Sequence, residues 1–299
     1  MSMSEIQRDL SAEKIAKRPS RIAVVLDYVR RYPLGAAGAM VVLAMLFMAV
    51  FADVIAPYDP EENSFEHMFS PPSLQFLLGT DDFGRDIFSR IIFGSRTALF
   101  VGFVAASVGA TAGLVLGVAS AYFGGWFDLV LQRVMDVFMA FPLIIMALAV
   151  VAVLGTGIDK VIIAITIPFI PMCARVVRSS ALAIREIPYV DAARACGFSH
   201  ARIILRHMVP NVMAPYLIMI TAFVGQAILL EAVLSYLGLG VQEPTAAWGL
   251  MLKSGAEEYA ESAPWIAIFP GVAISLAVFG FNLFGDALRD ALDPKLRMQ

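Results

Sequence analysis

Five long stretches without a charged side chain constrain this sequence more than any other feature. They cover residues 32–52, 97–127, 137–158, 207–230 and 262–285. Each reaches the roughly 20 residues that a helix needs to cross about 30 Å of hydrocarbon. Because lipid offers the backbone no hydrogen-bond partner, such crossing segments must be helical. Only 16% of the 299 residues are charged, against about 25% in soluble domains. We therefore predict an all-α, polytopic membrane protein.

A sixth span is predicted between Lys160 and Arg175. Its 14 uncharged residues are interrupted by Pro168 and Pro171, and it can cross if Arg175 and its neighbour Arg178 extend their heads to the interface. Lys and Arg concentrate in cytoplasmic loops. Six spans with both termini in the cytoplasm place 17 of the 22 Lys and Arg residues on the inner side. Without this span six arginines and the C-terminal tail would lie outside, so six spans are preferred.

The spans define the expected organisation of the chain. We expect a cytoplasmic N-terminal tail at 1–33, a first transmembrane helix at 34–56 and an external loop at 57–96. A five-helix core would follow at 97–288, with a cytoplasmic loop at about 180–212, and a cytoplasmic tail at 289–299. The first apolar run is too long for the core of a cleaved signal peptide. The N-terminal helix is therefore expected to remain as an anchor.

Small residues recur every four positions in the second span, at Ala105, Gly109, Gly113, Gly117 and Ala121. This spacing places them on one helix face, where another helix can approach closely. The stripe predicts tight helix packing, either within the subunit or against a partner subunit.

Few polar groups lie at membrane depth. Glu231 follows a long uncharged run, and Asn282 lies in the last one. A carboxylate in lipid is costly and usually faces a cavity or a partner. For Glu231 we favour a structural hydrogen-bond anchor, with a role along a transport pathway as the alternative. Asp136, which precedes Phe141-Pro142, is expected at the interface.

Several motifs for nucleotide binding, nucleophilic catalysis and metal binding are absent from the sequence. There is no G-x-x-x-x-G-K-[ST] phosphate loop and no G-x-S-x-G motif. The three histidines show no metal-ligand spacing. We therefore predict no catalytic residue, no metal and no cofactor bound by this chain, and no nucleic-acid partner. If the protein uses energy, another chain would have to supply it.

A basic, amphipathic island at 189–211 separates two apolar runs. Pro188 suits the first turn of a helix, and Gly197 permits the left-handed turn that ends one. Ser199 is a suitable N-cap for a second helix, which Pro210 is expected to end. The pattern predicts a helix–turn–helix at the membrane surface that can lie in a groove on a partner. The alternative is an inert hairpin held by anionic lipid.

The same segment resembles the EAA loop of ABC importer permeases. The resemblance rests on Asp191-Ala-Ala, on Gly197 and on the His207-Met-Val-Pro210 run. Asp191 stands where the family usually has Glu, which keeps the charge on a shorter stem. In that family the loop couples to the ATP-hydrolysing subunit. The resemblance therefore implies a coupling role for Asp191, Ala192, Ala193, Arg194, Gly197, His207 and Pro210.

Further segments are similar to the dipeptide, oligopeptide and nickel permease branch, specifically its C-type subunit. They are Phe51–Pro60, Leu78–Arg90, Leu234–Val241 with Trp248-Gly249, and Phe281–Arg297. The resemblance implies the type I ABC importer permease fold in a bacterial or archaeal plasma membrane. It also implies partners: a second homologous permease, two ABC ATPase subunits that hold the ATP and Mg²⁺, an extracytoplasmic substrate-binding protein, and membrane lipid.

The external segment before the second span contains Asp81, Gly84, Arg85 and Asp86. We favour a structural cap near the gate, with docking of the binding protein as the alternative. The cargo remains open: peptides lead on family frequency, and nickel or another solute is possible within the same machine. An ATP-independent secondary transporter and a non-transporting scaffold are the competing classes. Sparse intramembrane carboxylates count against the former.

Overall fold

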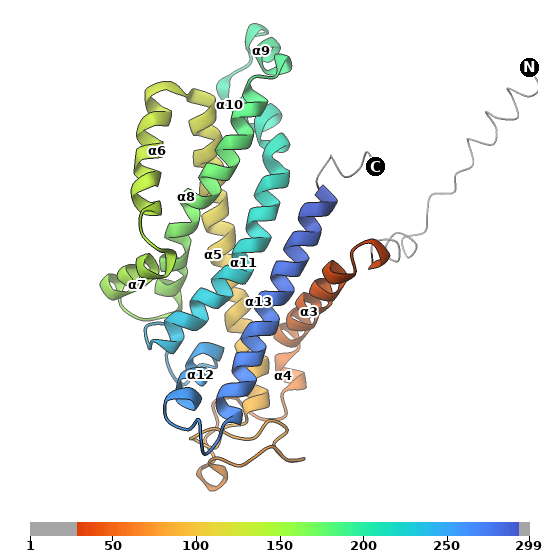
Figure 1. Ribbon diagram of the computed structural model, residues 1–299, viewed down its shortest axis with the longest axis vertical. Coiled ribbons are helices and arrows are strands. Elements are labelled where there is room, and N and C mark those ends of the chain that lie inside the picture. Colours follow the sequence, from red (N-terminus) through yellow and green to blue (C-terminus); the bar gives the residue numbers. More distant parts are fainter. Residues whose placement is uncertain (1–28, 293–299) are drawn as a thin grey trace, which may run out of the picture.

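The computed structural model describes residues 29–292, and nearly all of the regular structure in this range is helical (Figure 1). Five helices are long and apolar enough to cross a membrane. They are α3 (Pro33–Val50), α5 (Ile87–Phe123), α8 (Ile158–Arg185), the continuous helical segment His200–Tyr236 that contains α11 (Met213–Tyr236), and α13 (Trp265–Leu292). A sixth span is broken, because α6 (Gly125–Met139) and α7 (Leu143–Leu154) meet at 88°. The predicted six-span architecture is confirmed when this bent pair is counted as one span.

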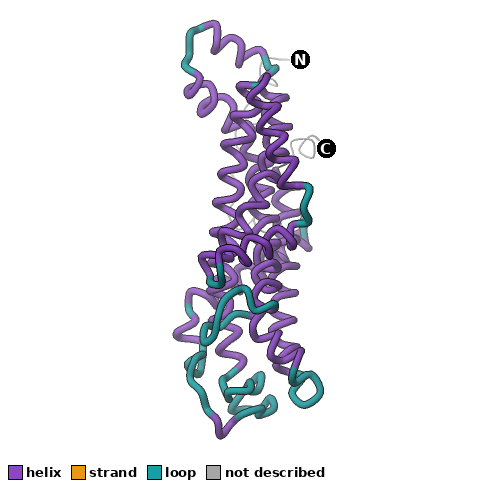
Figure 2. Tube along the Cα trace, turned by 90° about the vertical axis from the view of Figure 1, so that its left-hand side faces the viewer, coloured by secondary structure: helices purple, strands orange, loops and turns teal. Residues whose placement is uncertain are grey.

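The bundle is elongated, with different structures at its two ends (Figure 2). One end carries a helical hairpin made of α9 (Pro188–Ala195) and α10 (His200–Ile203). The opposite end carries α4 (Ala52–Ile55), the loop that follows it with a short 3₁₀ turn (Phe65–His67), and α12 (Trp248–Glu257). We call these the coupling end and the external end, following the predicted topology. Most of the predicted 1–33 and 289–299 tails lie outside the described residues.

Helix α5 is the central element, since it contacts α8, α11 and α3. Its small residues lie directly against α8. A Cβ added to Gly113 would stand 2.6 Å from the Cβ of Cys173, and one added to Gly117 would stand 2.6 Å from the Ala174 carbonyl oxygen. Gly109 meets Phe169 in the same way, at 2.8 Å. The stripe therefore packs within this subunit, which decides between the two alternatives that the sequence left open.

Two helix boundaries differ from the prediction at the external end. The first span ends at Val50 and is followed by the separate helix α4, rather than continuing to residue 56. The second begins at Ile87 rather than at 97, because the Asp86 side chain caps it by accepting a hydrogen bond from the Ser89 N–H at 2.8 Å. Its first turns carry Arg90, which is buried. A boundary placed at the start of the uncharged run therefore made this helix too short.

Two prolines act differently from each other. The chain breaks at residues 140–142 between α6 and α7, where Pro142 disfavours a helical backbone at Phe141. Pro210, in contrast, does not end the second helix of the hairpin as expected. A π-helical turn (Ile204–Met208) and a 3₁₀ turn (Val209–Val212) carry the chain past it into α11. Pro210 lies in the first positions of the 3₁₀ turn, where its missing N–H costs little.

Candidate coupling surface and external cap

The α9–α10 hairpin is built by three local signals. Pro188 occupies the first turn of α9, Gly197 takes the left-handed backbone with φ +76°, and the Ser199 hydroxyl accepts a hydrogen bond from the Arg202 N–H at 3.4 Å. Val190 and Ala193 are buried. One face of the hairpin thus packs against the bundle, and the other is open.

Most of the residues that the sequence singled out lie on the open face. Asp191, Ala192, Arg194, Gly197 and Pro210 are exposed, whereas Ala193 is buried and His207 is half-buried. The Arg194 guanidinium donates to Asp191 at 3.0 Å, which ties the two exposed charges together. Large apolar side chains are exposed beside them, at Tyr189, Phe198 and Leu205. This combination of apolar and basic groups suits a protein partner more than lipid alone.

The base of the hairpin is fixed by a small hydrogen-bond cluster. Asn211 Nδ2 donates to the His207 carbonyl oxygen at 2.6 Å and to the Tyr189 hydroxyl at 3.1 Å. The Tyr189 hydroxyl in turn donates to the same carbonyl at 3.3 Å. These bonds join the start of α9 to the π-helical turn, so the two arms of the hairpin are held together beside α11.

A second contact joins the hairpin to α5, and the sequence did not reveal it. The Tyr122 hydroxyl and His200 Nδ1 form a hydrogen bond of 2.7 Å. The Arg194 guanidinium lies over the Tyr122 ring, 5.4 Å from its centroid. Tyr122 is only 5% exposed. A tyrosine near the end of a span is common at membrane interfaces, so its position gave no specific signal.

The external end contains a charge cluster in which Asp81, Arg85 and Arg90 are buried and Glu243 is 45% exposed. Arg85 donates to Asp81 at 2.7 Å and to Glu243 at 2.6 Å. Arg90 donates to the Pro60 carbonyl oxygen at 2.9 Å and lies 3.6 Å from Glu243. Burial by itself lowers the pKa of Arg85, but the hydrogen bond to Glu243 and the charge of Asp81 outweigh it and raise that pKa. The guanidinium therefore stays charged and joins two distant segments.

All four residues expected in the external loop are buried, Asp81, Gly84, Arg85 and Asp86, and two of them, Asp81 and Arg85, belong to the charge cluster. Glu243 completes it from the loop after α11. The indole N–H of Trp265 also donates to the Thr80 carbonyl oxygen at 3.2 Å. We call the group Asp81, Arg85, Arg90 and Glu243 the external cap.

The two polar groups expected inside the membrane are not brought together. Glu231 is 1% exposed and accepts a hydrogen bond from the Ser235 hydroxyl at 2.7 Å. The same hydroxyl accepts from the Val241 N–H at 3.1 Å, so the carboxylate supports the turn after α11. Asn282 is exposed on α13. Glu231 has the geometry of a structural anchor.

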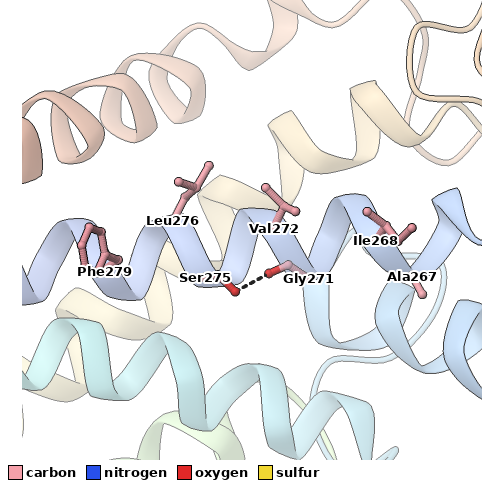
Figure 3. A pocket seen from close by; sticks show the side chains of 7 residues that line it. All are labelled: Ala267, Ile268, Gly271, Val272, Ser275, Leu276 and Phe279. Atoms are coloured by element: carbon pink, nitrogen blue, oxygen red, sulfur yellow. Dashed lines mark hydrogen bonds between the residues drawn. The ribbon is translucent and has the colours of Figure 1, made fainter.

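An open groove of about 570 Å³ runs along α13 (Figure 3). Its lining is apolar apart from Ser275, whose hydroxyl donates to the Gly271 carbonyl oxygen at 2.8 Å. No charged side chain lines it, so it offers little polar chemistry. Among the described residues, no group of three or more His, Cys, Asp or Glu side chains is placed to hold a metal ion.

Comparison with known families and structures agrees with this architecture. Residues 113–298 match the family described as binding-protein-dependent transport system inner membrane component. Residues 20–72 match the N-terminal TM domain of oligopeptide transport permease C. The fold is similar to a chain of the MetNI methionine ABC transporter in an inward-facing conformation, with a TM-score of 0.56 and 18% identity over 69% of this chain and 98% of that one.

Curated relatives cover most of the chain. It is 46% identical to a putative peptide transport system permease protein of Brucella abortus, over 86% of this chain and 88% of the relative. It is 41% identical to the dipeptide transport system permease protein DppC of Alkalihalophilus pseudofirmus, and 43% identical to the glutathione transport system permease protein GsiD of Escherichia coli, each over 90% of this chain and 88% of the relative. The chain therefore belongs to the binding-protein-dependent transport system inner membrane component family, as a C-type permease subunit of an ABC importer.

Proposed function

We propose that this permease carries di- or oligopeptides across the plasma membrane of a bacterium or archaeon. The observation that supports this cargo is that relatives over 40% identical along most of the chain are named for peptide, dipeptide and glutathione transport. Glutathione is itself a tripeptide, so these names share one chemical class. The same machine could in principle carry nickel or another small solute, which the experiment below distinguishes.

The exposed hairpin supports the proposed way in which the subunit works. In this mechanism, a second homologous permease completes the pathway, and two ATPase subunits bind ATP and Mg²⁺ below it. A binding protein delivers cargo at the external end. When ATP closes the ATPase pair, the hairpin is pushed. The balance between the inward-facing and outward-facing forms is then set by the difference in affinity that each ligand has for the two forms. This chain performs no bond chemistry itself.

The test is to purify the chain with the products of its neighbouring genes and to reconstitute the assembly in lipid. ATPase activity and uptake are then measured with the binding protein and with dipeptides. We expect dipeptides to stimulate both activities in the wild type. Gly197→Asp is expected to abolish the stimulation while the assembly still forms, because the added charge and strained backbone disturb the exposed turn.

Each alternative has its own result. Stimulation by nickel or another solute, and by no peptide, would keep the importer and overturn the cargo. Wild-type uptake by the Gly197→Asp variant would overturn the coupling role of the hairpin. Uptake that proceeds without any ATPase would point to a secondary transporter.

A further inference from the structure

Charged side chains of α6 and α8 lie at a depth where exposure to lipid is costly. The uncharged part of α8, between Lys160 and Arg175, has 14 residues and is about 21 Å long at 1.5 Å per residue. This is about 9 Å shorter than the hydrocarbon layer. The start of α8 lies on the external side of the bundle, beside the loop after α11, where the Gly157 N–H donates to the Gly240 carbonyl oxygen at 3.3 Å. Arg175 therefore lies within the inner part of the membrane.

Arg175 shares this depth with two charges of α6. Its guanidinium donates to Asp136 at 2.5 Å, and the Arg133 guanidinium lies 3.6 Å from the same carboxylate. The side chains of Arg133, Asp136 and Arg175 are 78%, 46% and 48% exposed. Two cations thus share one anion on an open surface. Charged groups at this depth normally face a water-filled passage or another protein chain rather than lipid.

An apolar hollow begins one helical turn from these charges. Met139 follows Asp136 by three residues, Met172 precedes Arg175 by three, and both side chains line a cavity of about 180 Å³. This cavity shares Phe138, Phe141 and Met146 with a larger, open hollow of about 660 Å³ lined by α6, α7 and α8. The 88° bend between α6 and α7 brings both helices to the hollow.

The composition of the hollow suits a variable ligand. Methionine is unbranched and polarizable, so it adapts to side chains of different shape, and it is frequent at surfaces that bind many partners. A peptide combines a carboxylate terminus with side chains of variable size. The spare positive charge beside Asp136 is matched to such a carboxylate, because charge-assisted hydrogen bonds from Arg to carboxylate are strong and directional.

We propose that Arg133, Asp136 and Arg175, together with the methionine-lined hollow, form a cargo site on the transport pathway. The arginines receive the carboxylate of a short peptide, and Met139 and Met172 contact its apolar side chain. This inference rests on the proposed peptide function. It adds the part of the pathway that recognises the peptide, and the preference for an apolar residue beside the free carboxylate.

Accessibility to water is the first test. Met139→Cys and Met172→Cys are made in a Cys196→Ser background and assembled with the partner subunits in lipid nanodiscs. Cys173 is buried and stays in place. A charged, membrane-impermeant thiol reagent is added with and without the dipeptide Ala-Phe, with Gly-Gly as the small-side-chain probe. Met40→Cys, on an exposed position of α3, gives the background rate.

We expect the reagent to modify both site cysteines and Ala-Phe to slow the modification about tenfold, with a smaller effect of Gly-Gly. Modification of these cysteines only by a lipid-soluble maleimide would show that the face is turned to lipid and would overturn the proposal. So would modification that is insensitive to every dipeptide that the wild type takes up.

Uptake kinetics separate binding from structure. Met172→Ala is expected to raise the KM for Ala-Phe about tenfold and the KM for Gly-Gly less, because glycine has no side chain to contact Met172. Arg133→Gln should raise the KM of both dipeptides, while the Arg175–Asp136 pair that joins α6 to α8 remains. Unchanged KM values in both variants would overturn the site alone. If the wild type takes up no dipeptide, the proposed function fails instead.

Discussion

Gly84, which precedes Arg85 of the external cap, has no room for a side chain. Its φ is +72°, and a Cβ at this position would stand 1.8 Å from the Ser64 carbonyl oxygen. Gly197 has a similar φ of +76°, but a Cβ there would meet no atom within 4 Å. The two glycines therefore separate the effect of backbone strain from that of steric overlap.

Gly84→Ala is expected to destabilise the protein more than Gly197→Ala does. In both variants alanine must adopt a left-handed backbone, which lowers the free energy of unfolding by about 1 kcal/mol. Only Gly84→Ala adds an overlap with fixed backbone, for which roughly 1–3 kcal/mol more is expected. Thermal unfolding of the purified protein in detergent measures the difference. Equal Tm values would show that the loop at Ser64 moves away freely.

Asp82, at the edge of the cap, predicts a dependence of stability on pH. Burial raises the pKa of its carboxyl, and the negative charge of Asp81 raises it further. A folded-state pKa above the unfolded value favours folding at low pH, and this contribution is lost as the pH rises through the folded pKa. At neutral pH the ionised Asp82 therefore destabilises the folded state.

Asp82→Asn removes this penalty. We expect the variant to have a higher Tm than the wild type at about pH 7 to 8. The gain should shrink as the pH falls toward about 4, the ordinary aspartate value. Tm is measured across this range in one buffer series. A gain that stays constant with pH would contradict the electrostatic cause.

At the scale of elements, the contact between α5 and α8 depends on the absence of side chains. In Gly113→Val the added Cβ would lie only 2.6 Å from the Cβ of Cys173, which is closer than two carbon atoms can approach. We expect a loss of roughly 1–3 kcal/mol through overpacking and a lower Tm in detergent. Ser107→Val adds a branched side chain to an exposed position of the same helix and should change the Tm little. Similar losses in the two variants would contradict packing as the cause.

At the scale of the whole molecule, α5 links the two candidate sites, the hairpin and the external cap. Its first turns carry Arg90 of the external cap, and its last turn carries Tyr122, which bonds to His200 of the hairpin. A helix of 37 residues without a proline is stiff, so a displacement of the hairpin should move α5 as one body. We therefore expect the Tyr122 contact to pass movement from the ATPase side to the bundle.

Tyr122→Phe removes this hydrogen bond, worth about 1 kcal/mol, and keeps the ring under Arg194. In the reconstituted importer we expect less peptide uptake per ATP hydrolysed, while ATPase subunits still bind. The ratio of uptake to phosphate release measures this. Tyr236→Phe, at the external end of α11, is the matched control. An unchanged ratio in Tyr122→Phe would show that this hydrogen bond is not needed to transmit the movement.

The sequence by itself determined the features that depend on neighbours along the chain. Apolar runs of sufficient length predicted the spans, four-residue spacing predicted the face of α5 that packs closely, and Gly197 with Ser199 predicted the turn of the hairpin. These features follow from helix periodicity and local backbone preference, which a few consecutive residues express. The same locality explains why the bend between α6 and α7 appeared in the sequence only as a proline, with no indication of its angle.

Only the tertiary structure decided which distant groups meet. Arg85 forms a hydrogen bond with Glu243, 158 residues away in the sequence, and Tyr122 forms one with His200, 78 residues away. Arg175 and Arg178 bond to Asp136 and Asp128 of α6, and no sequence motif indicated these pairs. Such pairs depend on how whole helices cross, and buried or membrane-depth charges are stable only where a partner is supplied. The packing of the bundle, rather than any local motif, determines where those partners lie.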